Sequence, residues 1–132
     1  MKVFADTFFF LPLLDSRDAA HDEARQLARR PWRRIYTTDY ILLELGSALS
    51  APEDRSDFLA LLSMMQRAPV YEILPASPAL LEAGLHLFSQ RPDKHWSLTD
   101  CLSMTVMSQL SLQEVLTADH HFQQAGFKPL LA

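Results

Sequence analysis

Hydrophobic and polar positions along this chain follow the short period of strands in some stretches and the longer period of helices in others. Mostly apolar runs at residues 2–7, 34–37, 70–74 and 114–117 predict four strands, and residues 127–130 predict a short edge strand. Helical spacing predicts helices at residues 19–30, 40–49, 52–67, 78–90 and 98–110. Strands that alternate with helices predict a three-layer α/β/α sandwich around a mainly parallel sheet of four or five strands.

Proline and capping residues support several of these boundaries. Pro31 ends the helix that precedes it, and Ser77 followed by Pro78 is typical of a helix start. Ser97 precedes the next helix in the position of an N-cap. Asp119 is expected to begin a last short helix that ends near Gly126.

The composition indicates one globular domain covering residues 1–132, because 48% of the residues are hydrophobic and no repeat or linker interrupts the chain. The single cysteine, Cys101, permits no internal disulfide and is expected to be a small core residue. The apolar run at the N-terminus is broken by Asp6, so it does not resemble a signal peptide. No stretch reaches transmembrane length without a charge, and we expect a cytoplasmic protein that does not enter membranes.

The charge of the chain is uneven. The net charge is −4, yet six of the 12 basic residues lie between positions 17 and 34. This cluster is either a solvated helix end or a surface that follows an RNA backbone, and Arg29, Arg30, Arg33 and Arg34 are its candidate RNA contacts. Trp32 either stacks a base or, as we favour, packs in the core.

Four acidic residues occupy positions where a charge is unexpected. Asp6 and Asp119 directly follow predicted strands, Glu44 is the sole ionisable residue between positions 40 and 51, and Asp100 is the sole charge between 96 and 113. Buried carboxylates need a partner, a proton or a metal ion. Each also has a structural interpretation: Asp6 and Asp119 as N-caps, Glu44 as the partner of an arginine, and Asp100 in a capping box with Ser97.

Taken together, the four acids favour a metal site. Strand-to-helix turns of a parallel sheet lie at one edge, so Asp6, Glu44 and Asp119 are expected there, and Asp100 completes the cluster if its helix begins nearby. Carboxylates that converge without a lysine repel one another, and divalent cations neutralise them. A set of oxygen ligands suits Mg²⁺ or Mn²⁺ rather than Zn²⁺.

The ordered set Asp6-Thr7, Glu44, Ser97-Leu98-Thr99-Asp100 and Thr117-Ala118-Asp119 resembles a PIN domain, and more narrowly a VapC-type toxin ribonuclease. The resemblance covers essentially the whole chain. It implies that the four acids hold one or two Mg²⁺ or Mn²⁺ ions, and that Thr7, with Ser97 and Thr117, supports them.

The resemblance also implies an activity and partners. The implied activity is hydrolysis of RNA phosphodiester bonds by metal-activated water, and the implied partners are a VapB-like antitoxin and a second copy of the chain in a homodimer. Met64 and Met65, with neighbouring leucines, either belong to the core or line a groove for that antitoxin. Phe8 departs from the family pattern, which is small or polar at this position. The alternative is therefore a PIN-fold protein that no longer cleaves and that binds RNA or a protein.

The histidines do not form a recognisable metal motif. His120 and His121 are adjacent, so both cannot point at one site, and we expect both to be exposed, with at most one touching RNA. His21, His86 and His95 lack a partner at ligand spacing and are interpreted as surface or boundary residues.

Overall fold

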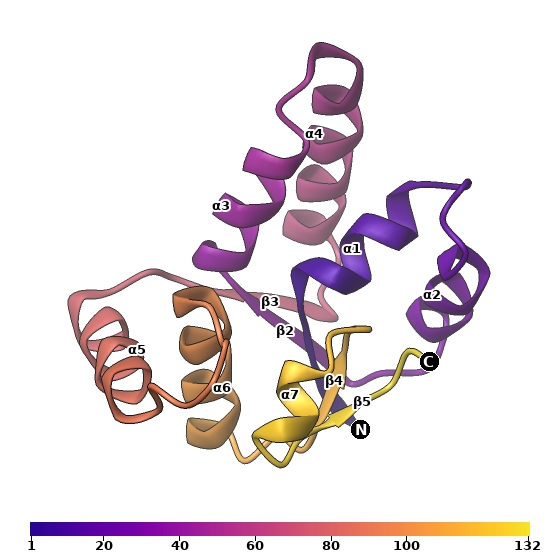
Figure 1. The fold of residues 1–132 in the computed structure, drawn as a ribbon. Helices are drawn as coiled ribbons and strands as arrows, with labels where there is room; N and C mark the ends of the chain where they lie inside the picture. Colours follow the sequence, from indigo (N-terminus) through magenta and orange to yellow (C-terminus); the bar gives the residue numbers. More distant parts are fainter.

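A parallel sheet of five strands forms the centre of the computed structural model, which describes all residues from Met1 to Ala132 (Figure 1). The strands are β1 (Lys2–Ala5), β2 (Arg34–Thr38), β3 (Tyr71–Leu74), β4 (Glu114–Leu116) and β5 (Lys128–Pro129). Their order across the sheet is β3-β2-β1-β4-β5, and every neighbouring pair is parallel. The predicted fold class is confirmed, and β1 is the middle strand.

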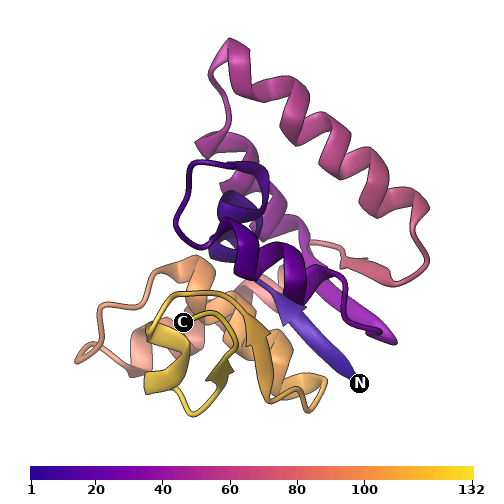
Figure 2. The same cartoon turned by 90° about the vertical axis from the view of Figure 1, so that its right-hand side faces the viewer.

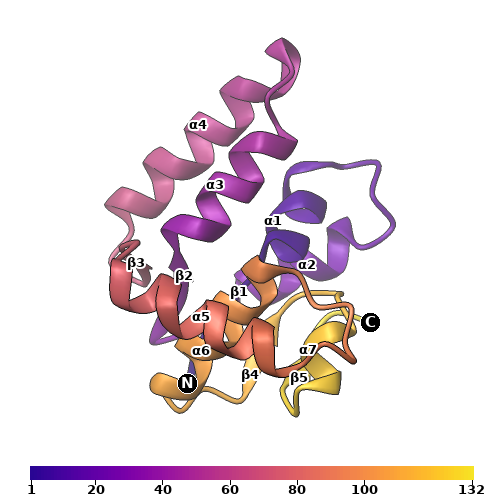
Figure 3. The same cartoon turned by 60° about the vertical axis from the view of Figure 1, so that its left-hand side comes forward.

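Seven helices surround this sheet: α1 (Thr7–Leu14), α2 (His21–Ala28), α3 (Asp39–Ala48), α4 (Pro52–Arg67), α5 (Pro78–Gln90), α6 (Leu98–Gln109) and α7 (His121–Gln124). Helices α1 and α2 pack together on one side of the strands, and α5, α6 and α7 lie on the other (Figures 1 and 2). Helices α3 and α4 form a pair that projects beyond the sheet (Figure 3). No helix combines the length and the apolar character needed to cross a membrane.

Most predicted boundaries agree with the structure to within one or two residues, and two differences have local causes. Helix α2 begins at His21 rather than at residue 19, because the Asp18 carboxylate accepts the Ala20 N–H at 2.8 Å and holds a turn there. The last helix begins at His121 rather than at Asp119, whose carboxylate instead accepts the His121 N–H at 2.9 Å.

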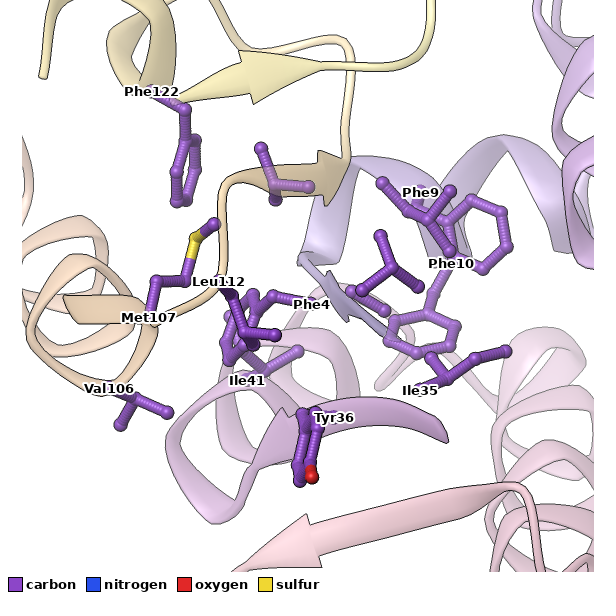
Figure 4. Close-up of a cluster of buried hydrophobic side chains, with 14 of the residues drawn as sticks. Phe4, Phe9, Phe10, Ile35, Tyr36, Ile41, Val106, Met107, Leu112 and Phe122 are labelled. Atoms are coloured by element: carbon purple, nitrogen blue, oxygen red, sulfur yellow. The ribbon is translucent and has the colours of Figure 1, made fainter. Parts of the chain in front are cut away.

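The core fills both faces of the middle strands. Val3, Phe4 and Ala5 are successive residues of β1 with no exposed surface, so helices cover this strand on both sides. Phe9 and Phe10 of α1 pack edge to face at 5.3 Å between ring centres. Figure 4 shows side chains from β2, α1, α6 and α7 converging on these strands. Each such side chain contributes roughly 1.5–3 kcal/mol of transfer free energy.

Several residues of uncertain role in the sequence belong to this core. The Trp32 ring is buried and its Nε1 donates a hydrogen bond to the Leu27 carbonyl at 2.8 Å, so the packing interpretation is confirmed. Cys101 is also buried, and burial raises the pKa of its thiol. Leu61 and Met65 of α4 point into the core as well.

Candidate metal and catalytic site

The ends of β1 and β4 form the centre of the candidate site. The chain runs from β1 to β2 and β3 on one side and then places β4 and β5 on the other, so the strand order reverses between β1 and β4. Open parallel sheets bind ligands beyond the carboxyl ends of strands at such a point. Asp6 follows β1 and Thr117 follows β4, and the Thr117 hydroxyl donates to Asp6 Oδ2 at 2.8 Å.

Asp6 is a buried carboxylate without a cationic partner. It is the N-cap of α1 and accepts the Phe8 N–H at 3.2 Å, so the structural interpretation as a cap is also correct. Its exposed fraction is 1%. The pKa of Asp6 is raised to about 7. Burial is the largest cause, the hydrogen bonds from Thr117 and Phe8 oppose the shift, and the charges of Asp100 and Glu44 add to it.

Glu44 reaches the site from the helix that follows β2. Thr38, the last residue of β2, caps α3 by accepting the Ile41 N–H at 3.2 Å, and this fixes where the helix begins. Ile41 and Leu45 then face the core, while Glu44 is partly buried beside them. The hydroxyl of Thr7, the first residue of α1, donates a hydrogen bond to Glu44 Oε1. No arginine pairs with Glu44.

Asp100 both caps its helix and faces the site. Its carboxylate Oδ2 accepts the Ser97 N–H at 3.0 Å, and its own N–H donates to Ser97 Oγ at 3.0 Å. This reciprocal pair is the capping box that the order Ser97-Leu98-Thr99-Asp100 predicts. The cap and the site are compatible, because the box fixes the Asp100 carboxylate at the start of α6.

Asp119 and His121 complete the cluster. The Asp119 N–H donates to Thr117 Oγ1 at 3.0 Å, so one threonine hydroxyl joins the Asp119 segment to Asp6. His121 Nδ1 lies 3.0 Å from Asp100 Oδ2 and 3.4 Å from Asp119 Oδ1. The expectation that both adjacent histidines are exposed is wrong for His121, whose side chain is 23% exposed, while that of His120 is 73% exposed. His120 Nδ1 lies 4.0 Å from Asp119 Oδ1 at the exposed rim, so His121 is the histidine that approaches both Asp100 and Asp119.

An open cavity of about 560 Å³ lies over these residues. Its wall contains three carboxylates and two histidines but no lysine or arginine. The lining residues are Thr7, Phe8, Leu11, Glu44, Ala48, His95, Ser97, Asp100, Ala118, Asp119 and His121. Phe8, Leu11 and Ala48 supply an apolar part of the wall, and Phe8 is 47% exposed. Phe8 therefore shapes the cavity without closing it. His95, interpreted as a surface or boundary residue, is exposed and lines the same cavity.

The donors of this site fit a divalent cation. No lysine or arginine forms an ion pair with the four acids. A carboxylate oxygen of Asp100, a carboxylate oxygen of Asp119 and a ring nitrogen of His121 all lie within 4.8 Å of one another. Ionised carboxylates in such proximity need a positive charge, and carboxylate oxygens are ligands of Mg²⁺ and Mn²⁺. The imidazole was not anticipated from the sequence.

The four candidate RNA-binding arginines do not lie with the acids. Arg33 and Arg34 are at the amino end of β2, and Arg29 and Arg30 are in the segment between α2 and that strand. Asp6 and Asp119 follow the carboxyl ends of β1 and β4, at the opposite edge of the sheet. Arg34 Nη1 also donates to the Pro69 carbonyl at 2.7 Å.

Comparisons with known proteins agree with the architecture. A family model of the PIN domain matches residues 3–128. VapC20 of Mycobacterium tuberculosis, a toxin described as cleaving the sarcin–ricin loop, is 22% identical with a TM-score of 0.88, covering 98% of this chain and 99% of VapC20. VapBC2 from Rickettsia felis, bound to a DNA fragment from their promoter, has 13% identity and a TM-score of 0.69, covering 98% of this chain and 97% of the other. FitAcB from Neisseria gonorrhoeae has 17% identity and a TM-score of 0.68, covering 98% and 95%. No curated protein sequence matched this chain.

Proposed function

The chain belongs to the PIN domain family, and we propose that it is a VapC-like, divalent-metal-dependent endoribonuclease. The observation that carries the proposal is the convergence of Glu44, Asp100 and Asp119 on one cavity, with Asp6 buried behind them and no lysine or arginine to neutralise them. Burying unpaired carboxylates is unfavourable, and the arrangement is explained if a cation binds there.

In the proposed mechanism, Asp6, Glu44, Asp100 and Asp119 hold one or two Mg²⁺ or Mn²⁺ ions. When bound, such ions lower the pKa of a water molecule and neutralise the charge that develops on the phosphate. The remaining residues orient these ligands, since the hydroxyl of Thr7 holds Glu44 and that of Thr117 holds Asp6.

The capping box and the neighbouring cavity complete this mechanism. The Ser97 N–H fixes the Asp100 carboxylate at the start of α6. No serine, cysteine or lysine is needed as a nucleophile. This agrees with a cavity whose only hydroxyl groups, on Thr7 and Ser97, belong to residues already engaged in hydrogen bonds with Glu44 and Asp100.

The wall of the cavity suits a nucleotide. Its acidic side would face the phosphate through the cation, and its apolar side, formed by Phe8, Leu11 and Ala48, would face a base. An exposed aromatic ring stacks any base, and each such contact contributes about 1–3 kcal/mol. We therefore assign Phe8 to substrate binding rather than to obstruction of the site.

We further propose a VapB-like antitoxin as a protein partner and a homodimer as the assembly. The likeness to VapC20, VapBC2 and FitAcB supports a toxin role for the fold. Helices α3 and α4 project from the body of the protein, and each exposes a large apolar side chain, Leu43 at 70% and Leu59 at 59%. Exposed leucines on a projecting helix pair suit the apolar face of a partner helix.

Cleavage of RNA tests the function directly. The purified protein would be incubated with RNA in Mn²⁺, Mg²⁺ or EDTA, beginning with a sarcin–ricin loop hairpin, because VapC20 is described as cleaving that loop. We expect the wild type to cleave RNA in Mn²⁺ or Mg²⁺ but not in EDTA. We expect the variants Asp6→Asn and Asp100→Asn to lose this cleavage. Asp18→Asn is the matched control. The Asp18 carboxylate accepts a backbone N–H from the residue two positions later, as the Asp6 carboxylate does, but Asp18 is exposed.

A folded protein that binds the cations but cleaves no RNA would favour the alternative, a PIN-fold regulator that acts by binding. A folded protein that binds no divalent cation would remove the basis of the nuclease proposal.

A further inference from the structure

His121 occupies a position that the resemblance did not assign. Its Nδ1 atom faces two of the proposed metal-binding carboxylates, at 3.0 Å from Asp100 Oδ2 and 3.4 Å from Asp119 Oδ1. These three residues are the group in the structure whose ligand atoms all lie within 4.8 Å of one another. A cation held by Asp100 and Asp119 would therefore lie next to the imidazole nitrogen of His121.

The separations of these atoms suit a shared ion. Ligand atoms on adjacent corners of an octahedron with bonds of about 2.1 Å lie about 3.0 Å apart, which is close to the two separations from Nδ1. The imidazole nitrogen is also a common metal ligand. The set of donors is then two carboxylate oxygens and one nitrogen from the start of α6 and the start of α7.

The local structure holds each donor in place. The capping box fixes Asp100, and the Asp119 carboxylate is held by the His121 N–H at 2.9 Å. His121 is followed by Phe122, which has no exposed surface and anchors α7 in the core. The ring of His121 therefore faces the acids because the backbone on either side of it is fixed.

We propose that His121 Nδ1 is a ligand of the divalent cation and that it makes this site prefer Mn²⁺ to Mg²⁺. The inference rests on the proposed function. Mg²⁺ keeps an oxygen and water environment and seldom accepts imidazole, whereas imidazole nitrogen binds transition-metal ions more readily. A site with only carboxylates would not separate the two ions in this way.

The competing role for His121 is that of a hydrogen-bond donor to Asp100 that never touches the ion. Removing a group that orients a ligand lowers affinity for both ions, whereas removing a nitrogen ligand lowers affinity for Mn²⁺ more than for Mg²⁺. A nitrogen bonded directly to Mn²⁺ also couples magnetically to its unpaired electrons. A supporting nitrogen does not produce that coupling.

The test is pulsed electron paramagnetic resonance of Mn²⁺ bound to the full chain, with Mn²⁺ and Mg²⁺ affinities from calorimetry. We expect a directly bonded ¹⁴N signal in the wild type and in His120→Asn, the matched neighbour whose ring is 73% exposed. We expect the signal to disappear in His121→Asn, with Mn²⁺ affinity reduced roughly tenfold or more and Mg²⁺ affinity changed much less. Circular dichroism confirms that each variant folds.

The outcomes separate this inference from the function on which it rests. Mn²⁺ bound by the wild type without a nitrogen signal, or a signal that persists in His121→Asn, would overturn the ligand role of His121 and leave the nuclease proposal standing. A signal lost only in His95→Asn would transfer the role to the other histidine of the cavity. A wild type that binds neither ion would refute the nuclease proposal itself.

Discussion

The substitution Asp6→Asn should stabilise the metal-free protein at neutral and alkaline pH, although it removes a proposed metal ligand. Asparagine keeps the shape of the side chain and an oxygen that can accept the Phe8 N–H and the Thr117 hydroxyl, at 3.2 and 2.8 Å in the wild type. It removes only the charge. The change therefore isolates what the ionised carboxylate does to the fold when no cation is present.

The magnitude follows from the pKa of Asp6, which burial raises from 3.8 to about 7. Below about pH 4 the carboxyl is protonated in both the native and the unfolded chain, and it costs no stability. As the pH rises toward 7 the unfolded chain loses this proton first, so the free energy of unfolding falls, and above 7 the loss is complete. About three pH units at 1.36 kcal/mol each give a cost on the order of 4 kcal/mol.

Urea denaturation followed by circular dichroism, in EDTA, measures this difference. Other carboxyl groups titrate in the same range, so the quantity of interest is the free energy of unfolding of Asp6→Asn minus that of the wild type at each pH. We expect it to increase by on the order of 4 kcal/mol between pH 4 and pH 8. Asp18→Asn should show no such increase, because its side chain is exposed and surface substitutions usually change stability by less than about 0.5 kcal/mol.

A difference that stays constant across this pH range would refute the reasoning, since it would mean that ionised Asp6 is already neutralised without metal. Added Mn²⁺ provides an internal comparison. If the ion binds the native wild type as proposed, it should raise the free energy of unfolding of that protein by mass action and narrow or reverse the difference from Asp6→Asn.

Three further substitutions test the hydrogen bond that holds Glu44, the apolar wall of the cavity and the packing of α5 against α6. Thr7→Val removes the hydroxyl that holds Glu44, so calorimetry should show Mn²⁺ affinity reduced roughly 10–100-fold in a folded protein. Phe8→Ala removes the ring proposed to stack a base, and fluorescence anisotropy with Ca²⁺ in place of Mn²⁺ should show RNA binding weakened by about 1–3 kcal/mol. Gly84→Ala places a Cβ 2.5 Å from Leu102 Cδ2, so thermal denaturation should show a loss of about 1–3 kcal/mol.

Each of these expectations can fail in an identifiable way. Unchanged metal affinity in Thr7→Val would show that Glu44 needs no orienting hydroxyl. Equal effects of Phe8→Ala and of Leu59→Ala, a 59% exposed residue on α4, would mean that the ring has no specific place in RNA binding. Unchanged stability in Gly84→Ala would mean that Leu102 moves aside without cost.

The fold could be predicted from sequence because its signals are local. Apolar runs bounded by proline and polar residues marked β2 and β3, and the order of strands and helices implied a parallel sheet. The order of the strands was not accessible in this way. It depends on which strand the chain returns to after α6, and this long-range pairing places β4 beside β1 (Phe4 opposite Val115).

The candidate site could be predicted in part because its acids interrupt apolar stretches. A charge in such a stretch is visible in the sequence, as Glu44 and Asp100 show. His121 could not be identified in the same way, because the direction of its ring depends on where α7 begins, and this helix begins at His121 rather than at the predicted Asp119. The clustering of the arginines was visible in the sequence. Their separation from the acids was not, because it depends on the sheet, in which the amino ends of parallel strands lie at one edge and the carboxyl ends at the other.

This separation of charges bears on how RNA would be recognised. The cavity is lined by three carboxylates and no lysine or arginine, so its own field repels a phosphate. The arginines at the amino end of β2 cannot compensate at the same place. A divalent cation would therefore be required for RNA to enter the site as well as for cleavage, because it is the one positive charge available where the phosphate must lie. Ionised Asp6, which we expect to destabilise the metal-free fold, would be part of the charge that attracts the ion, so the same carboxylate would lower stability and favour metal binding.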